Sequence, residues 1–141
     1  MDELCFILKD LIQEKGLSLR GLAEESGVSA TQYSMYLRGT FPTIDSAVRI
    51  CDFFGCSIDY LCGLSEQRTS KARGYDMQHF LERYQKALAA NKTTHWKFCK
   101  QNGISESTLR HWQAGQTPKL ETLIKIADGL SVSIDYLVGR K

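Results

Sequence analysis

The residues that could carry metal, redox or acid–base chemistry are three histidines and five cysteines. No two cysteines have the C-x-x-C spacing that is typical of zinc and thioredoxin-like sites. The sequence also contains no glycine-rich phosphate-binding loop and no evident pairing of a nucleophile with a base. We therefore predict that the chain is not an enzyme and holds no metal or cofactor. The cysteines are interpreted as small apolar core residues: Cys5, Cys51, Cys56, Cys62 and Cys99.

Charged side chains are a second kind of candidate, because they are distributed unevenly along the chain. Residues 1–65 contain nine acidic and five basic residues, whereas residues 76–141 contain six acidic and ten basic residues and all three histidines. A basic segment favours a polyanionic partner such as nucleic acid. We therefore expect the two halves to have different partners, with the polyanion on the C-terminal half.

These residues belong to a unit that occurs twice. The heptapeptide Ser57–Gly63 recurs with one substitution as Ser133–Gly139, an offset of 76 residues. The same offset aligns Gly27 with Gly103 without a gap. We therefore divide the chain into a first unit at 1–65, a basic linker at 66–75 and a second unit at 76–141.

Each unit has the pattern of five short helices. Leucine and isoleucine residues recur at helical spacing near the N-terminus and predict a first helix at about residues 2–15. Serines and threonines that can cap helices, with glycines that can end them, predict the other four. The third helix is expected at 30–37 and again at 106–113, and Thr117 is a candidate cap for the next helix. Since no segment alternates apolar and polar residues, we predict an all-α protein of two tandem five-helix domains.

The second and third helices of each unit form a helix-turn-helix with a known counterpart. The segments Leu17–Ser29, Tyr36–Pro42 and Cys56–Leu61 resemble the phage-repressor-like (Cro/Xre-type) helix-turn-helix family. Residues 78–140 resemble it more loosely, chiefly through Gly103–Leu109. The resemblance implies lambda-repressor-like domains that bind double-stranded DNA and regulate transcription in bacteria or their phages, with repression as the expected mode.

In that family the third helix enters the major groove and its early residues contact base edges. In the second unit these positions hold Glu106, Ser107, Arg110 and His111. Arg110 could donate two hydrogen bonds to a guanine, and Glu106 could accept one from a cytosine. Contacts to phosphates are expected from the start of the second helix and from the loop after the third, at His95, Gln116 and Lys119.

The first unit offers weaker chemistry at the same positions. Its early third-helix residues are Ala30, Thr31, Ser34 and Met35, which can contact thymine methyl groups but cannot make a bidentate contact to guanine. Arg38 comes after them as an expected phosphate contact. We therefore interpret the second unit as the principal DNA-contacting domain. The first unit is interpreted as a weaker DNA-binding domain, a dimerisation surface, or both.

Two alternatives stay open at this level. One chain could place both units in successive major grooves as an intramolecular pseudo-dimer, or two chains could form a homodimer that contributes one DNA-binding unit each. The alternative function is a protein-interaction module, such as an antitoxin or adaptor, particularly for the first unit. A steep salt dependence of DNA binding would favour the regulator, because phosphate contacts release counterions.

The N-terminal segment is acidic and has no features of a secretory signal. No apolar run approaches the roughly 18–20 residues that a bilayer-spanning helix needs. We therefore expect a cytoplasmic protein with no membrane partner and no small-molecule substrate.

Overall fold

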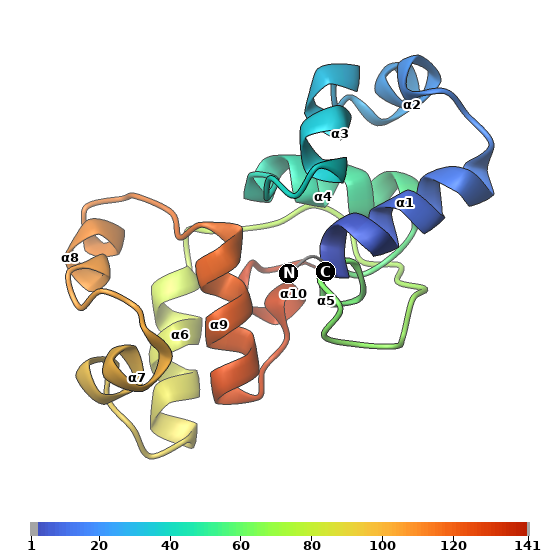
Figure 1. Cartoon of the computed structure of the whole chain (residues 1–141). Coiled ribbons are helices and arrows are strands. Elements are labelled where there is room, and N and C mark those ends of the chain that lie inside the picture. Colours follow the sequence, from blue (N-terminus) through green and yellow to red (C-terminus); the bar gives the residue numbers. More distant parts are fainter. Residues whose placement is uncertain (1–2, 141) are drawn as a thin grey trace. The chain divides into compact units, whose positions relative to one another are not determined.

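The computed structural model describes residues 3–140, which form two compact units divided between Gly74 and Tyr75. Within these residues the regular elements are all helices, apart from one isolated antiparallel bridge between Cys56 and Thr69. Each unit contains five helices (Figure 1). The all-α fold class with two tandem helix-turn-helix domains is therefore confirmed.

The first unit is built so that every helix covers part of one apolar core. It consists of α1 (Glu3–Lys15), α2 (Leu19–Ser26), α3 (Ala30–Leu37), α4 (Ile44–Phe54) and α5 (Ile58–Leu61). The third helix packs against α1 and α2, α2 also packs against α4, and α5 packs against α1 and α4. Each fully buried leucine or isoleucine of this core contributes about 1.5–3 kcal/mol relative to exposure. Residue 2, which we included in the first helix, lies outside the described residues.

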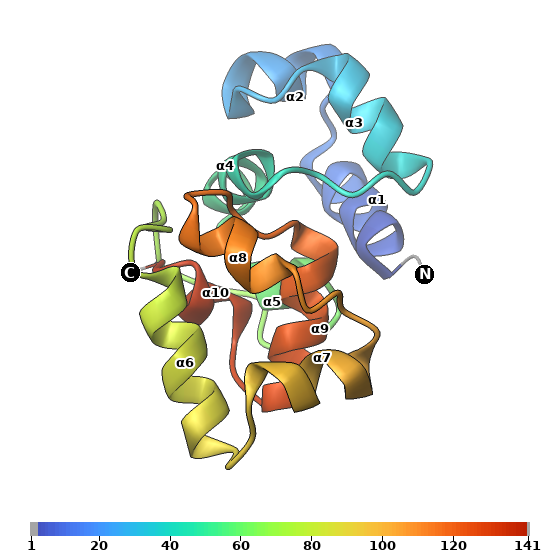
Figure 2. The ribbon, with the colours of Figure 1, turned by 90° about the vertical axis from the view of Figure 1, so that its left-hand side faces the viewer.

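The second unit repeats this order of elements. It consists of α6 (Phe80–Ala90), α7 (His95–Asn102), α8 (Thr108–Gln113), α9 (Leu120–Leu130) and α10 (Ile134–Leu137). The short α10 packs against α6 and α9, and α7 packs against α9. In Figure 2, α7 and α8 lie in front of α9, so the helix-turn-helix forms one side of this unit.

The core of the second unit is aromatic where the first unit is mostly aliphatic. The ring centroid of Trp112 lies 5.3 Å from that of Phe80 and 5.4 Å from that of Tyr84, both in edge-to-face geometry. The 76-residue offset matches Phe80 and Tyr84 with leucines of α1. Four of the five cysteines are buried and Cys5 is half-buried, in agreement with their interpretation as core residues.

Most helices begin at the caps that the sequence predicts. The side-chain oxygens of Ser18, Thr43 and Ser57 accept hydrogen bonds from backbone N–H groups in the first turns of α2, α4 and α5, at 3.1, 3.2 and 2.9 Å. The starts of α6, α8 and α9 are exceptions, because their N-cap residues His79, Ser107 and Lys119 make no side-chain capping bond. The expectation that Thr117 caps α9 is therefore wrong.

Much of the segment expected to be a linker, residues 66–75, is bound to the first unit. The backbone N–H of Ser57 donates to Arg68 O (3.2 Å), and that of Ser70 donates to Gly55 O (3.0 Å). The guanidinium of Arg68 pairs with the carboxylate of Glu14 and, chiefly through that hydrogen bond, lowers the pKa of Glu14. Backbone groups directly after α4 therefore form hydrogen bonds with residues 66–75, a segment that we had expected to be only a linker.

Candidate nucleic-acid interface

The helix-turn-helix of each unit depends on a glycine at the end of its first helix. Gly27 ends α2 with φ +81° and Gly103 ends α7 with φ +67°, a left-handed conformation that strains other residues. Their backbone N–H groups donate to the carbonyls of Ala23 and Cys99, one turn back along each helix. The chain can therefore turn and start α3 or α8 within a few residues.

In the first unit, α3 begins where we expected, because its first turn contains a capping box. The Ser29 hydroxyl accepts from the N–H of Gln32 (3.1 Å), and the Gln32 side chain accepts from the N–H of Ser29 (3.0 Å). These reciprocal bonds satisfy donors that a helix start otherwise leaves unpaired. They fix the orientation of the first turn, which carries Ala30 and Thr31.

In the second unit, α8 begins later than the expected helix at 106–113. The repeat replaces Gln32 by Thr108, whose shorter side chain donates back to the Ser105 carbonyl (2.8 Å) instead of accepting from the Ser105 N–H. The capping box is therefore lost. Glu106 and Ser107 lie in a turn, and the helix starts at Thr108. Two of the four expected base-contacting residues thus precede the helix.

His95 occupies a different environment from the phosphate contact that we expected. Its Nε2 lies 3.1 Å from the Glu106 carbonyl and its Nδ1 lies 2.8 Å from the Tyr84 hydroxyl. Since a carbonyl only accepts, Nε2 donates to it, and in the neutral ring Nδ1 accepts from the tyrosine. Both nitrogens are engaged within the unit, so His95 ties α6 and α7 to the turn before α8. The expectation of a free phosphate donor is corrected accordingly.

The two units differ at both partners of this hydrogen bond. At the positions of Tyr84 and His95 the first unit has Leu8 and Leu19. Leu8 is fully buried and Leu19 is half-buried. The second unit therefore has a hydrogen-bonded pair at positions where the first unit has two apolar residues. Burial raises the pKa of the Tyr84 hydroxyl well above its usual value, with a smaller contribution from Cys99.

The base-contacting residues expected within α8 are exposed. Arg110 and His111 are exposed, whereas the adjacent Trp112 is buried. The indole anchors one side of the helix in the aromatic core, and the two basic residues lie on the solvent side. Glu106 is also exposed, and Ser107 is half-buried. Arg110 thus has access to solvent at the position from which it could reach a guanine.

The corresponding surface of α3 is small and nearly neutral. Thr31 and Met35 are exposed and Ser34 is half-buried, with spacings of three and four residues that place them on one side of the helix. Arg38 comes next as the C-cap residue and is exposed. The basic residue among these expected contacts therefore lies at the end of α3.

The loop after α8 carries the other two expected phosphate contacts. Gln116 and Lys119 are both exposed. The backbone of Gly115 in this loop has φ +101°, a conformation that favours glycine. The turn of the chain after α8 therefore depends on a glycine at this position. The loop therefore presents a neutral donor and a positive charge directly after the helix that carries Arg110.

Basic side chains of both units form ion pairs. Arg20 lies 3.8 Å from Glu24, and Arg49 lies 2.9 Å from Asp45. In the second unit the acidic residue Asp76 is itself engaged by His79 (2.8 Å) and by Arg83. Hydrogen bonding to His79 is the main cause of the lowered pKa of Asp76. Three lysines are also exposed on α7 and in the loop before it: Lys92, Lys97 and Lys100.

One exposed aromatic residue beside the predicted surface was not anticipated. Trp96, the second residue of α7, is 51% exposed, and the ammonium of Lys100 lies 4.7 Å from the centre of its ring. The signal was present in the sequence, since a tryptophan four residues before a lysine on a helix shares its face. The same position in the first unit is Arg20.

Two five-helix units, each with a glycine-terminated helix-turn-helix, define a tandem helix-turn-helix protein. A family model described as helix-turn-helix matches residues 8–61 and 98–137, well over half of the chain. The chain therefore belongs to the Cro/Xre-type helix-turn-helix family, with two copies of its domain. This is a family of DNA-binding regulators and typically not of enzymes.

A curated relative supports this assignment. Over 80 residues the chain is 28% identical to YobD of Bacillus subtilis (strain 168), an uncharacterized HTH-type transcriptional regulator. The match covers 56% of this chain and 71% of the relative. No solved structure matches the chain significantly.

Two further observations concern the described residues alone. Among residues 3–140 no helix has the length and apolar character needed to span a membrane. The same residues contain no group of three or more histidine, cysteine or acidic side chains arranged to hold a metal ion.

Proposed function

We propose that the protein is a sequence-specific transcriptional repressor whose second unit makes the principal contacts to double-stranded DNA. The observation that carries this proposal is the exposed pair Arg110 and His111 on α8, beside the buried anchor Trp112. Arg110 would contact the O6 and N7 atoms of a guanine in the major groove. Glu106 and Ser107 would lie at neighbouring bases from the turn that precedes the helix.

Phosphate contacts would come from the loop after α8. Gln116 and Lys119 are exposed there, and phosphate contacts of this kind fix the position of a recognition helix without specifying sequence. His95 would act differently from a phosphate donor. By binding the Glu106 carbonyl it would hold the turn from which the base contacts start.

The first unit would be a weaker DNA-binding domain, with Thr31, Ser34 and Met35 facing thymine methyl groups and Arg38 facing a phosphate. Its acidic composition and its internally paired arginines also support a second role as a surface for dimerisation or for another protein. DNA-bound pairs of recognition helices in this class lie about 34 Å apart. Two such helices could come from one chain or from a homodimer.

The test is a selection from random duplex DNA with the full-length protein at near-physiological salt. We expect enrichment of two half-sites about one helical turn apart, at least one of them containing a guanine that Arg110 specifies. Binding should weaken steeply as salt increases, because bound phosphates release counterions. Weak retention without a motif would contradict the proposal and would favour a protein-interaction module.

A further inference from the structure

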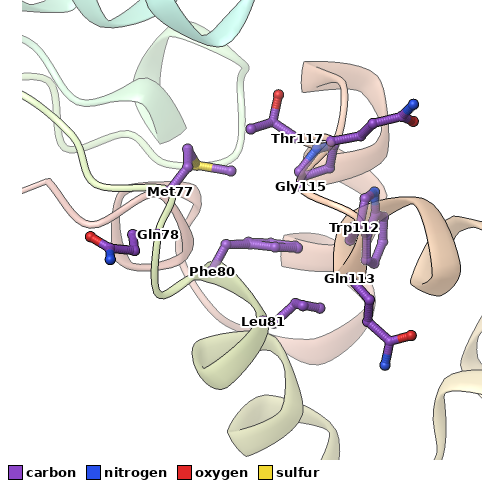
Figure 3. A pocket seen from close by; sticks show the side chains of 10 residues that line it. Met77, Gln78, Phe80, Leu81, Trp112, Gln113, Gly115 and Thr117 are labelled. Carbon is purple, nitrogen blue, oxygen red and sulfur yellow. The ribbon is translucent and has the colours of Figure 1, made fainter.

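A cavity in the second unit lies beside the loop that carries the proposed phosphate contact Gln116. It has a volume of about 430 Å³ and lies between the segment that leads into α6 and the loop after α8 (Figure 3). Its floor is formed by Phe80 and Trp112, whose ring centroids are 5.3 Å apart. In Figure 3, Met77 and Thr117 lie above these rings and Leu81 lies below them. Small-molecule sites are typically about 300–1,000 Å³ in volume.

One residue that lines this cavity is smaller than its counterpart in the first unit. Thr117 lines the cavity, and the 76-residue offset matches it with Phe41, which is half-buried in the first unit. A phenyl ring has therefore been exchanged for a short hydroxyl-bearing side chain. The neighbouring Pro118 is retained as Pro42, so the backbone of the loop keeps the same constraint.

The lining has a definite chemical character. Its polar side chains are the carboxamides of Gln78, Gln113 and Gln116 and the hydroxyl of Thr117, and no charged side chain is among the described residues that line it. A charged ligand would lose water without gaining an opposite charge, which is costly. The aromatic floor favours a ring, because rings make edge-to-face contacts with other rings.

We propose that this cavity binds a small uncharged ligand that carries an aromatic ring and a carboxamide-like group, and that the bound ligand weakens DNA binding by the second unit. The coupling to DNA rests on the proposed function. Gln116 lines the cavity and is also a proposed phosphate contact, so a ligand that draws its side chain into the cavity would remove that phosphate contact. By linkage, DNA must weaken ligand binding by the same factor.

The ligand site can be tested on the full chain without DNA. The chain has two tryptophans, Trp96 and Trp112, so its NMR spectrum contains two indole N–H signals. The probes are benzamide, nicotinamide and indole-3-carboxamide. We expect at least one of them to shift the Trp112 signal in a saturable way while the Trp96 signal stays in place. Benzoate, which has the same ring but a negative charge, should bind at least tenfold more weakly than benzamide.

Two variants separate the cavity from a non-specific surface. Thr117→Phe restores the residue of the first unit and should weaken probe binding at least tenfold, and Leu81→Phe should narrow the cavity from the opposite wall. No shift of Trp112 with any of the three carboxamides would overturn the proposal, as would unchanged binding to both variants or equal binding of benzoate.

With a binding probe, the Kd for DNA should rise in the wild type and not in Thr117→Phe. If the probe leaves the Kd of the wild type for DNA unchanged, the proposed coupling is overturned. If the protein selects no DNA site at all, the proposed function is overturned, whereas the result on probe binding still holds.

Discussion

At the scale of single residues, the two units differ in the pair of side chains directly before the buried aromatic residue of the proposed recognition helix. Arg110 and His111 precede Trp112 in α8, whereas Ser34 and Met35 precede Tyr36 in α3. A guanidinium can donate two parallel hydrogen bonds to one guanine, whereas a hydroxyl or thioether cannot. The exposed Arg110 is therefore the residue with the largest expected effect on sequence preference.

Arg110→Ala should relax base preference at one position of the selected site, with a loss of about 1–3 kcal/mol of discrimination. Lys119→Ala should instead weaken binding to all sequences evenly and reduce the salt slope by about one. Both effects are measured by titrating the selected site and its single-base variants at several salt concentrations. Lys125→Ala is the control, because Lys125 is exposed on α9 and outside the proposed contacts. If Arg110→Ala kept full discrimination, α8 would not be the recognition helix.

The buried Tyr84, which is hydrogen-bonded to the half-buried His95, has a consequence for stability at high pH. Burial raises the pKa of Tyr84, so the folded protein keeps the phenolic proton at a pH where the unfolded chain releases it. The usual tyrosine pKa is about 10. Between that value and the raised one the folded state binds more protons, so the stabilising contribution is complete below about pH 10 and is lost as the pH rises further.

Tyr84→Phe should therefore flatten the loss of stability above about pH 10. The measurement is the free energy of unfolding in urea at several pH values on both sides of this point, for wild type and variant. Tyr136→Phe serves as the control, because Tyr136 is 43% exposed in the same unit. Parallel pH profiles for the wild type and Tyr84→Phe would show that this hydroxyl makes no such contribution.

At the scale of elements, the two units differ in the sizes of two matched residues on their second and fourth helices. A Cβ atom added at Gly129 of α9 would lie 2.7 Å from the ring of Phe98 on α7, so Gly129 makes room for that ring. The first unit has Leu22 and Phe53 at these positions. The larger residue at these matched positions is therefore on the second helix in the second unit and on the fourth helix in the first unit.

Gly129→Ala should lower the free energy of unfolding by about 1–3 kcal/mol, since overpacking outweighs the gain in helix propensity. Phe98→Leu should lower it too, because it leaves space in the core. The double variant should lose less than the sum of the two, with an interaction energy above about 0.5 kcal/mol. Urea unfolding of the four proteins measures this cycle. Strict additivity would mean that the close approach between Phe98 and Gly129 has no energetic effect.

Helix starts could be predicted from the sequence wherever a cap acts through its own side chain. Ser18 and Thr43 are caps of this kind, and the helices after them begin as expected. The start of α8 could not be predicted from Ser105 alone, because its capping box needs a glutamine where the second unit has Thr108. The start of α9 could not be predicted either, because its N-cap residue Lys119 makes no side-chain capping bond that the sequence would reveal.

The exposed residues of the site were more predictable than the buried ones. The periodicity of a helix places Arg110 on the side opposite the core, and the structure agrees. The partners of His95 lie eleven residues away on either side, in α6 and before α8, and no local pattern indicates them. A comparison of the two units would have helped, because Leu8 and Leu19 replace Tyr84 and His95 together.

At the scale of the whole chain, the connection between the units is shorter than the composition suggests. Ser70 is bound to Gly55 in the first unit, and the N–H of Asp76 donates to Val138 O in the second (2.6 Å). Six virtual bonds separate these two anchors, so they can be at most about 20–22 Å apart. The stretch that joins these anchors is therefore residues 71–75, and a longer stretch would admit a wider range of separations between the units.

This restriction predicts how the chain selects DNA if its own two units occupy both half-sites. The wild type should then accept a narrow range of half-site spacings near one helical turn, about 34 Å. Insertion of ten glycine and serine residues between Lys71 and Ala72 should broaden that range without changing the half-site sequences. Selection from libraries of variable spacing measures it, with a glycine–serine replacement of residues 71–75 at constant length as the control. If the insertion leaves the spacing unchanged, the two half-sites must be occupied by separate chains, because only a contact outside the connection could then fix their distance.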